Sequence, residues 1–155
     1  MTHTIGIIVG EFHKQLADEM LAHAQSLAPG LNATIEDVIW VPGSFEIPFV
    51  LNEMLKTNNY DAIVILGYIE KGETLHGEVM AHQVIKKIID LELHFQKPVG
   101  IGIIGPGATM EQAEVRTKGS AEKAMKAAIK LLKIKDQMRK YGARQKEKKT
   151  RRIDK

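Results

Sequence analysis

The 155-residue chain contains no cysteine and no apolar run long enough to cross a bilayer as a helix. The lack of cysteine excludes disulfides, cysteine-ligated zinc and thiol nucleophiles. The first residues lead directly into a strand-like apolar segment, without the basic stretch, hydrophobic region and cleavage site of a secretion signal. We therefore expect a cytoplasmic protein with no membrane partner. A chain of this length buries about 68–70% of its unfolded surface, which suffices for one hydrophobic core.

Motifs for metals and nucleotides are also missing. His76 and His82 lie six residues apart, so they do not share a helical face, and the other four histidines have no ligand spacing. There is no H-E-x-x-H sequence and no P-loop, and Gly100-Ile-Gly102 lacks the context of a dinucleotide-binding loop. We expect neither a metal ion nor an organic cofactor.

Basic charge is concentrated at the carboxyl end. Residues 133–155 contain 11 of the 22 Lys/Arg and 3 of the 19 Asp/Glu, a local net charge of +8, whereas residues 1–132 have a net charge of −5. We predict an α/β domain over residues 1–132, followed by a basic helical extension over 133–155 that is frayed or disordered at its end. Such an extension can bind RNA or an acidic surface, but with Tyr141 as its only aromatic residue a solvated helix end is favoured.

Apolar runs and amphipathic stretches alternate along residues 1–132. Continuous apolar runs predict strands, and apolar residues at helical spacing predict helices. The predicted strands are residues 4–9, 33–41, 61–67 and 97–104. The predicted helices are residues 12–27, a helix after Ser44 with Pro48 in its first turn, residues 74–95, residues 110–116, and a last helix from about Ser120. This alternation predicts a flavodoxin-like α/β fold, a doubly wound four-stranded parallel sheet with helices on both faces.

Ligands of such sheets bind beyond the carboxyl ends of the strands. We therefore expect a site built from the segments that begin at Gly10, Val41, Gly67 and Gly105. Phe12 can stack on a planar ring there, or it can fasten the first helix to the sheet.

The predicted third helix begins with groups suited to phosphate binding and proton transfer. Gly72-Glu-Thr-Leu-His76 lies at the start of this helix, where free backbone N–H groups and the positive dipole end favour an anion such as phosphate. Alternatively, Thr74 can act as an N-cap that satisfies the same donors. The positive end of the helix dipole disfavours the imidazolium form of His76 and favours a neutral ring that exchanges protons, although a surface role is the alternative. Arg116 can bind a phosphate through two hydrogen bonds or form a surface salt bridge.

Three motifs resemble those of the 6,7-dimethyl-8-ribityllumazine synthases: Val41-Pro-Gly-Ser-Phe-Glu-Ile-Pro48, Gly72-Glu-Thr-Leu-His76 and Glu111-Gln-Ala-Glu-Val-Arg116. They occur in the family's order, and the resemblance spans about Ile5 to Leu132. Gly72-Glu-Thr-x-His and Gly105-Pro-Gly107 are closer to the archaeal branch than to the bacterial one. The resemblance implies a transferase of riboflavin biosynthesis that condenses 5-amino-6-(D-ribitylamino)uracil with 3,4-dihydroxy-2-butanone 4-phosphate, without metal or cofactor.

The resemblance also implies roles for individual residues. Phe12 would stack on the pyrimidine, His76 would transfer protons and Arg116 would pair with the phosphate. The ribityl chain would contact Ser44, Phe45 and Glu46. The edge of the ring would be read by the backbone of Tyr68, Ile69 and Glu70, and the phosphate would contact the backbone of Glu73 and Thr74.

Members of the family form pentamers with sites shared between neighbouring subunits, and some close into capsids of twelve pentamers. Ile101 would be presented to the ring by the adjacent subunit, where many members have an aromatic residue. His13 replaces a frequent asparagine and Tyr68 a small residue, and either Lys118 or Lys123 can correspond to a nearby family lysine.

Two other functions stay open at this point. One is an archaeal-type riboflavin synthase that acts on two lumazine molecules. The other is a non-catalytic shell or RNA-associated scaffold that uses the basic extension.

Overall fold

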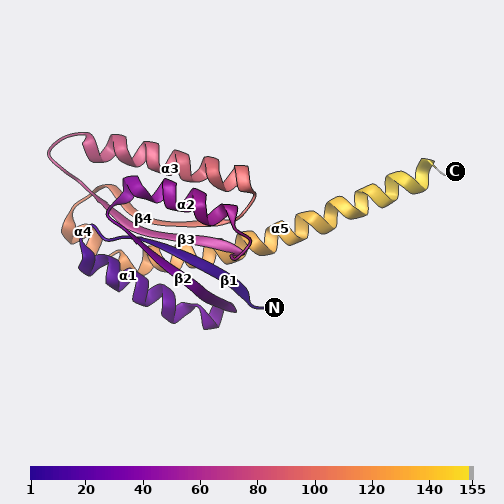
Figure 1. Ribbon diagram of the computed structural model, residues 1–155, viewed down its shortest axis with the longest axis horizontal. Coiled ribbons are helices and arrows are strands. Elements are labelled where there is room, and N and C mark those ends of the chain that lie inside the picture. Colours follow the sequence, from indigo (N-terminus) through magenta and orange to yellow (C-terminus); the bar gives the residue numbers. More distant parts are fainter. Residues whose placement is uncertain (154–155) are drawn as a thin grey trace.

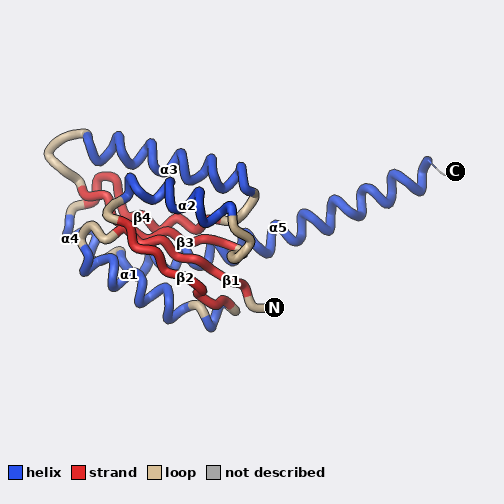
Figure 2. The backbone as a smooth tube through the Cα atoms, in the orientation of Figure 1, coloured by secondary structure: helices blue, strands red, loops and turns tan. Residues whose placement is uncertain are grey.

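The computed structural model describes residues 1–153, without the side chains of 147, 148 and 150–153, and contains one parallel four-stranded sheet (Figures 1 and 2). The strands are β1 (His3–Gly10), β2 (Ala33–Val41), β3 (Ala62–Glu70) and β4 (Val99–Ala108). The helices are α1 (Lys14–Leu27), α2 (Ile47–Lys56), α3 (His76–Phe95), α4 (Met110–Glu114) and α5 (Thr117–Ile153), with the short 3-10 helices η1 (Pro29–Leu31) and η2 (Ser44–Glu46). The strand order β2-β1-β3-β4 is flavodoxin-like, so the predicted fold class is confirmed.

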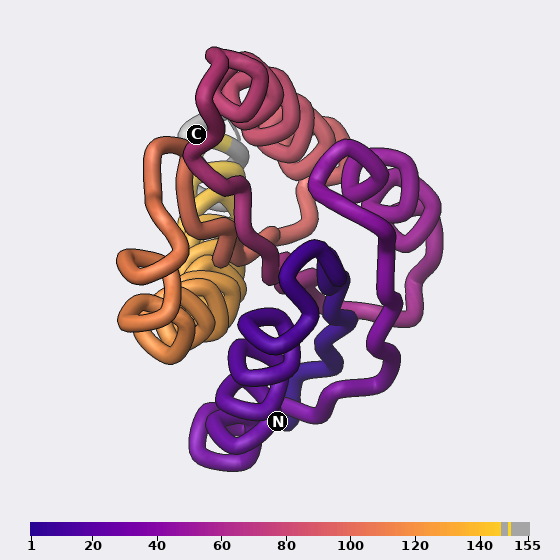
Figure 3. Tube along the Cα trace, turned by 90° about the vertical axis from the view of Figure 1, so that its left-hand side faces the viewer, coloured from indigo at the N-terminus to yellow at the C-terminus, as the bar shows by residue number. Residues whose placement is uncertain are grey.

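Helices cover both faces of the sheet, as the end-on view shows (Figure 3). Side chains from α1 and α5 pack with Ile7 and Val9 of β1 on one face, and side chains from α2 and α3 pack near Ile8 on the other. Successive side chains of a strand point to opposite faces, so a strand covered on both sides is apolar throughout. This explains why the apolar runs of β1 and β3 predict their positions.

The α5 helix lies very close to β4. A Cβ atom added at Gly100 would lie 2.1 Å from the backbone oxygen of Ala124, and one at Gly102 would lie 3.1 Å from the Ala124 Cβ. Gly100 and Gly102 therefore allow the helix to pack directly on the strand. This packing explains why both positions are glycine, and a nucleotide-binding role is not needed to explain them.

Two strands are longer than predicted. β3 continues beyond Gly67 to Glu70, and β4 continues through Gly105-Pro-Gly107 to Ala108. The predicted ends were wrong because the two strands keep pairing there: Lys71 N donates a hydrogen bond to Ala108 O at 3.0 Å. The site residues at 68–70 consequently lie on a strand and not on a loop.

Several helix boundaries also differ from the predictions. α1 and α3 each begin two residues later than predicted, at Lys14 and His76. α4 ends at Glu114 and α5 begins at Thr117, so Arg116 lies in the turn between them and not in a helix.

The last helix continues far beyond the domain (Figure 1). α5 passes position 133 without a break and reaches Ile153, and every residue from Lys133 to Lys146 is exposed. The predicted frayed end falls partly on residues 154–155, outside the described residues. No helix in the described part of the chain is long and apolar enough to span a membrane.

Candidate active site

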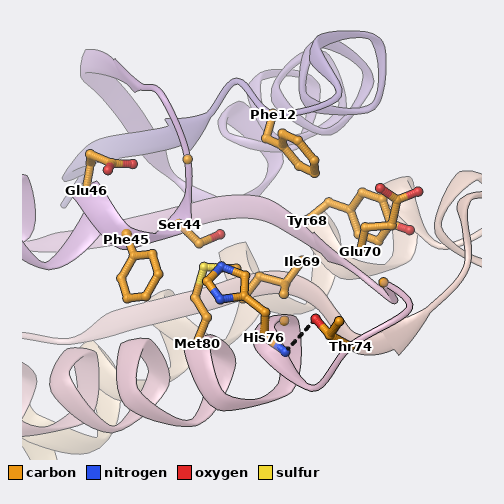
Figure 4. Close-up of a pocket in the computed structure, with 13 residues that line it drawn as sticks. Phe12, Ser44, Phe45, Glu46, Tyr68, Ile69, Glu70, Thr74, His76 and Met80 are labelled. Carbon is orange, nitrogen blue, oxygen red and sulfur yellow. Dashed lines mark hydrogen bonds between the residues drawn. The ribbon is translucent and has the colours of Figure 1, made fainter.

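A cavity of about 430 Å³ opens at the carboxyl ends of β1, β2 and β3 (Figure 4). β1 and β3 are neighbours, and their connections lead to helices on opposite faces of the sheet. This is the topological switch point at which doubly wound sheets bind ligands. We call this hollow the main cavity. It is lined by Phe12, Gly43, Ser44, Phe45, Glu46, Tyr68, Ile69, Glu70, Gly72, Thr74, His76, Gly77 and Met80.

Most of the predicted site residues border the main cavity. They come from the turn after β1, the η2 helix, the end of β3 and the start of α3: Phe12, Ser44, Phe45, Glu46, Tyr68, Ile69, Glu70, Thr74 and His76. Sequence reasoning missed Met80, which lies four residues after His76 on α3 and therefore on the same helical face. That spacing could have revealed it.

Aromatic side chains and an imidazole surround the opening of the main cavity. Phe12 and His76 extend into it from opposite sides, with Ser44 between them (Figure 4). The ring centroids of Phe45 and His76 are 6.2 Å apart, and Phe12 is 51% exposed. Ser44 is buried, so its hydroxyl belongs to the wall. The arrangement offers a planar ligand one exposed aromatic face with an imidazole across from it.

The start of α3 is held against the end of β3. A Cβ atom at Gly77 would lie 2.8 Å from the backbone oxygen of Glu70, so only glycine permits this packing without a shift. Leu75, not Thr74, is the N-cap residue and supplies no side-chain cap, while His76 N donates to Thr74 Oγ1 at 3.4 Å. The close contact fixes His76 at the cavity, at the positive end of a 20-residue helix.

The end of β3 forms the inner wall. Tyr68 is only 3% exposed, and its hydroxyl donates a hydrogen bond to Ala108 O at 2.7 Å. Burial, followed by the negative charges of Glu70 and Glu111, raises the pKa of Tyr68. Tyr68 therefore stays protonated at neutral pH and serves as a wall that links β3 to the end of β4.

Three predicted site residues lie outside the main cavity. Glu73 borders an adjoining depression of about 330 Å³ that shares Glu70 and Thr74 with the cavity. Arg116 borders a third hollow of about 350 Å³ along the end of β4, and its Nη1 donates to Gln112 O at 2.6 Å. Ile101 is half-buried on β4 against the core beneath α2 and α3. We call these hollows the Glu73 depression and the Arg116 depression.

Comparison with known proteins decides the family. A sequence model described as 6,7-dimethyl-8-ribityllumazine synthase matches residues 2–136. Curated proteins of that name are similar to the chain: one from Saccharolobus islandicus is 47% identical over 128 residues, covering 83% of both chains. One from Metallosphaera sedula is 46% identical over 127 residues, covering 82% of this chain and 84% of the relative. One from Staphylothermus marinus is 44% identical over 128 residues, covering 83% and 85%.

The chain belongs to the 6,7-dimethyl-8-ribityllumazine synthase family. The three motifs that resemble the family border the hollows described above. Residues of the first two motifs line the main cavity, and the third motif ends at Arg116, which lines the Arg116 depression. Neither Lys118 nor Lys123 borders the main cavity or the two depressions. The family membership identifies an enzyme of riboflavin biosynthesis. Within one chain, the family's motifs line separate hollows.

Proposed function

We propose that the chain condenses 5-amino-6-(D-ribitylamino)uracil with 3,4-dihydroxy-2-butanone 4-phosphate to give 6,7-dimethyl-8-ribityllumazine, phosphate and water. The observation that carries this proposal is the main cavity itself, in which two of the family's motifs meet at the switch point of the sheet. The names of relatives with up to 47% identity support the same activity.

The pyrimidine substrate suits the upper part of the main cavity. Phe12 offers an exposed ring on which the pyrimidine stacks. Ser44 and Glu46 supply a hydroxyl and a carboxylate for the hydroxyl groups of the ribityl chain, and Phe45 covers it. The backbone at the end of β3 then reads the edge of the ring.

The phosphate of the second substrate suits the start of α3. The N-cap residue of α3 supplies no side-chain cap, and the positive dipole end of this long helix favours an anion. Glu73 and Thr74 take part through their backbone N–H groups, which makes an acidic side chain compatible with a phosphate. Arg116 supplies the full positive charge that a phosphate ester needs.

A second copy of the chain completes the site. In the single chain, Arg116 and Ile101 lie outside the main cavity. Large apolar side chains of η2, α2 and the start of α3 are exposed to an extent that a neighbouring subunit would reduce: Phe45 54%, Phe49 73%, Leu75 71% and Val79 58%. We therefore propose a head-to-tail ring in which one copy contributes the main cavity and the next contributes Arg116 and Ile101. A pentamer, free or in a sixty-subunit capsid, satisfies this arrangement, and a cytoplasmic location stays a prediction.

The reaction depends mainly on holding two substrates together. The uracil amine attacks the ketone and loses water to form an imine, phosphate leaves, and the resulting enol tautomerises before the second amine closes the ring with loss of another water. Positioning alone supplies about 7–11 kcal/mol in favourable cases. Proton transfer by His76 adds a factor of about 10²–10⁴.

A steady-state absorbance assay for lumazine formation tests the proposal. We expect formation above the uncatalysed rate only when both substrates are present. Conversion of lumazine to riboflavin without the butanone phosphate would instead identify a riboflavin synthase. No activity on either substrate set, in protein shown to be folded and assembled, would favour a non-catalytic shell.

A further inference from the structure

The carboxyl-terminal part of α5 leaves the domain as a single projecting helix (Figures 1 and 2). Leu132 is still buried in the core, and Lys135 Nζ donates a hydrogen bond to Gln96 O at 2.6 Å, at the end of α3. Beyond Lys135, residues 136–153 continue the helix for about 27 Å, at 1.5 Å per residue. We call residues 136–153 the projecting segment.

The projecting segment is strongly basic. It contains eight Lys/Arg and two acidic residues, a net charge of +6. The side chains from Asp136 to Lys146 are all exposed, and the pair of Arg139 and Asp136, at 3.3 Å, lies on the surface. Like charges along an isolated helix repel one another, and an anion bound along the helix relieves that repulsion. The segment is therefore suited to a ligand with many negative charges.

An exposed aromatic ring lies among these cations. Tyr141 is 59% exposed and borders a shallow groove with Lys140 and Arg144. Proteins that bind single-stranded nucleic acid combine cations for the phosphates with aromatic rings on which bases stack. The groove presents both groups within one turn of helix.

We propose that the projecting segment binds single-stranded nucleic acid, with its Lys and Arg side chains on the phosphates and one base stacked on Tyr141. The shared chemistry of RNA and DNA, a phosphodiester chain with unpaired bases, defines the ligand. Arg139, Lys140, Arg144 and Lys149 fall on more than one side of the helix at 3.6 residues per turn. The strand can therefore follow the helix without a fixed register.

The apolar residues of α5 do not extend far enough for a membrane or a partner helix. Leu131, Ile134, Met138 and Tyr141 recur at alternating spacings of three and four, but positions 142–152 contain no large apolar residue. A helix on a membrane surface needs an apolar face along its length, and a coiled coil needs a continued heptad pattern. Phosphate binding needs only cations. Six of the eleven residues at positions 142–152 are Lys or Arg.

The projecting segment lies far from the main cavity. It leaves the domain at the end of the sheet where the amino terminus lies, and the β3–α3 connection lies at the opposite end (Figure 1). Nucleic-acid binding can therefore be changed without changing lumazine formation, and the inference does not rest on the proposed function.

Fluorescence anisotropy with a labelled 20-nucleotide RNA, and DNA of the same sequence, tests the inference on the full chain. We expect dissociation constants of about 10⁻⁵ M or lower at 0.1 M salt, with an affinity that falls as salt rises, by a logarithmic slope of about −0.7 for each phosphate contacted. Equal affinity for both strands would identify the phosphodiester chain as the ligand, and tighter RNA binding would identify RNA.

Two matched triple variants separate the projecting segment from general basic charge. Replacing Lys140, Arg144 and Lys149 by Gln should weaken binding about ten-fold or more. Replacing Lys56, Lys87 and Lys126 by Gln removes the same charge from the domain and should change the affinity less than two-fold. Both variants should keep the wild-type oligomeric state, since multivalency alone changes apparent affinity.

A further pair of variants tests the stacking. Tyr141→Ala should weaken single-strand binding several-fold and leave duplex binding unchanged, whereas Tyr141→Phe should behave as wild type. The inference is overturned if both triple variants lose the same affinity, if the duplex binds more tightly than the single strand, or if phosphatidylserine vesicles bind as tightly as RNA.

Discussion

His76 and Arg116 border different hollows of the same chain. His76 lies in the first turn of α3 and lines the main cavity, whereas Arg116 follows α4 and lines the depression along the end of β4. The proposed reaction needs a proton-transfer group and a phosphate-binding cation at one site. We infer that the two groups of each site come from neighbouring copies of the chain.

The phosphate role of Arg116 predicts a selective effect on one substrate. Arg116→Ala should raise the KM for the butanone phosphate roughly 10- to 100-fold, because hydrogen bonds to a charged partner contribute about 1.5–3 kcal/mol. The KM for the pyrimidine should stay within two-fold of wild type. Arg139→Ala, an exposed arginine of the projecting segment, is the matched control and should leave both constants unchanged. Unchanged kinetics for Arg116→Ala would remove this residue from the site.

The proton-transfer role of His76 predicts a loss of turnover. His76→Gln should lower kcat by about 10²–10⁴ while the pyrimidine dissociation constant, measured by titration, changes little. His94→Gln is the control, because His94 lies on the same helix at its other end. A large loss of pyrimidine affinity with normal kcat would assign His76 to binding instead.

His13 is predicted to position groups for pyrimidine binding. Its Nε2 lies 3.1 Å from Glu70 Oε2, and its ring meets the Phe12 ring edge-on at 4.4 Å between centroids. His13→Ala removes both contacts and should raise the pyrimidine KM about three- to ten-fold, as expected for about 1 kcal/mol, with a smaller change in kcat. His13→Gln retains a donor for Glu70 and should recover part of the loss. A fall in kcat at unchanged KM would contradict a positioning role.

The raised pKa of Tyr60 predicts that the free energy of unfolding falls at alkaline pH. A hydrogen bond to Asp37, followed by burial, raises the pKa of Tyr60 to about 12 in the folded chain, from an ordinary value of 10.0. The folded state therefore holds this proton more tightly, and the resulting stability, about 3 kcal/mol, is present below pH 10 and lost as pH rises towards 12.

Chemical denaturation between pH 8 and 12 measures this effect. Tyr60→Phe should be less stable than wild type at pH 8 and should lose less stability on going to pH 12. Tyr141→Phe, at an exposed position, should follow the wild-type curve. Parallel curves for Tyr60→Phe and wild type would show that the raised pKa does not contribute.

The sequence predicts the parts of this fold that depend on local pattern. β1 and β3 are found from uninterrupted apolar runs, because both faces of each strand are covered. The ends of β3 and β4 are not found, because glycine at 67 and 105 usually marks a turn, while the pairing of Lys71 with Ala108 depends on two segments far apart in sequence.

The candidate site likewise has a part that local sequence pattern predicts and a part that depends on tertiary contacts. The predicted residues that follow β1 and β2, together with those at the end of β3 and the start of α3, lie around the main cavity. The position of Arg116 outside that cavity could not be predicted, because it depends on a two-residue turn between α4 and α5. The contact of His13 with Glu70 is also invisible in sequence, since 57 residues separate the two side chains.

A subunit-mixing assay tests most directly whether two chains build one site. His76→Ala and Arg116→Ala are each purified, checked for low activity, dissociated together and reassembled in equal amounts. If neighbouring copies share a site, about a quarter of the sites in the mixed rings regain both groups, and lumazine formation rises towards a quarter of the wild-type rate. If both groups act within one chain, every site keeps one defect, and the mixture remains as inactive as its components.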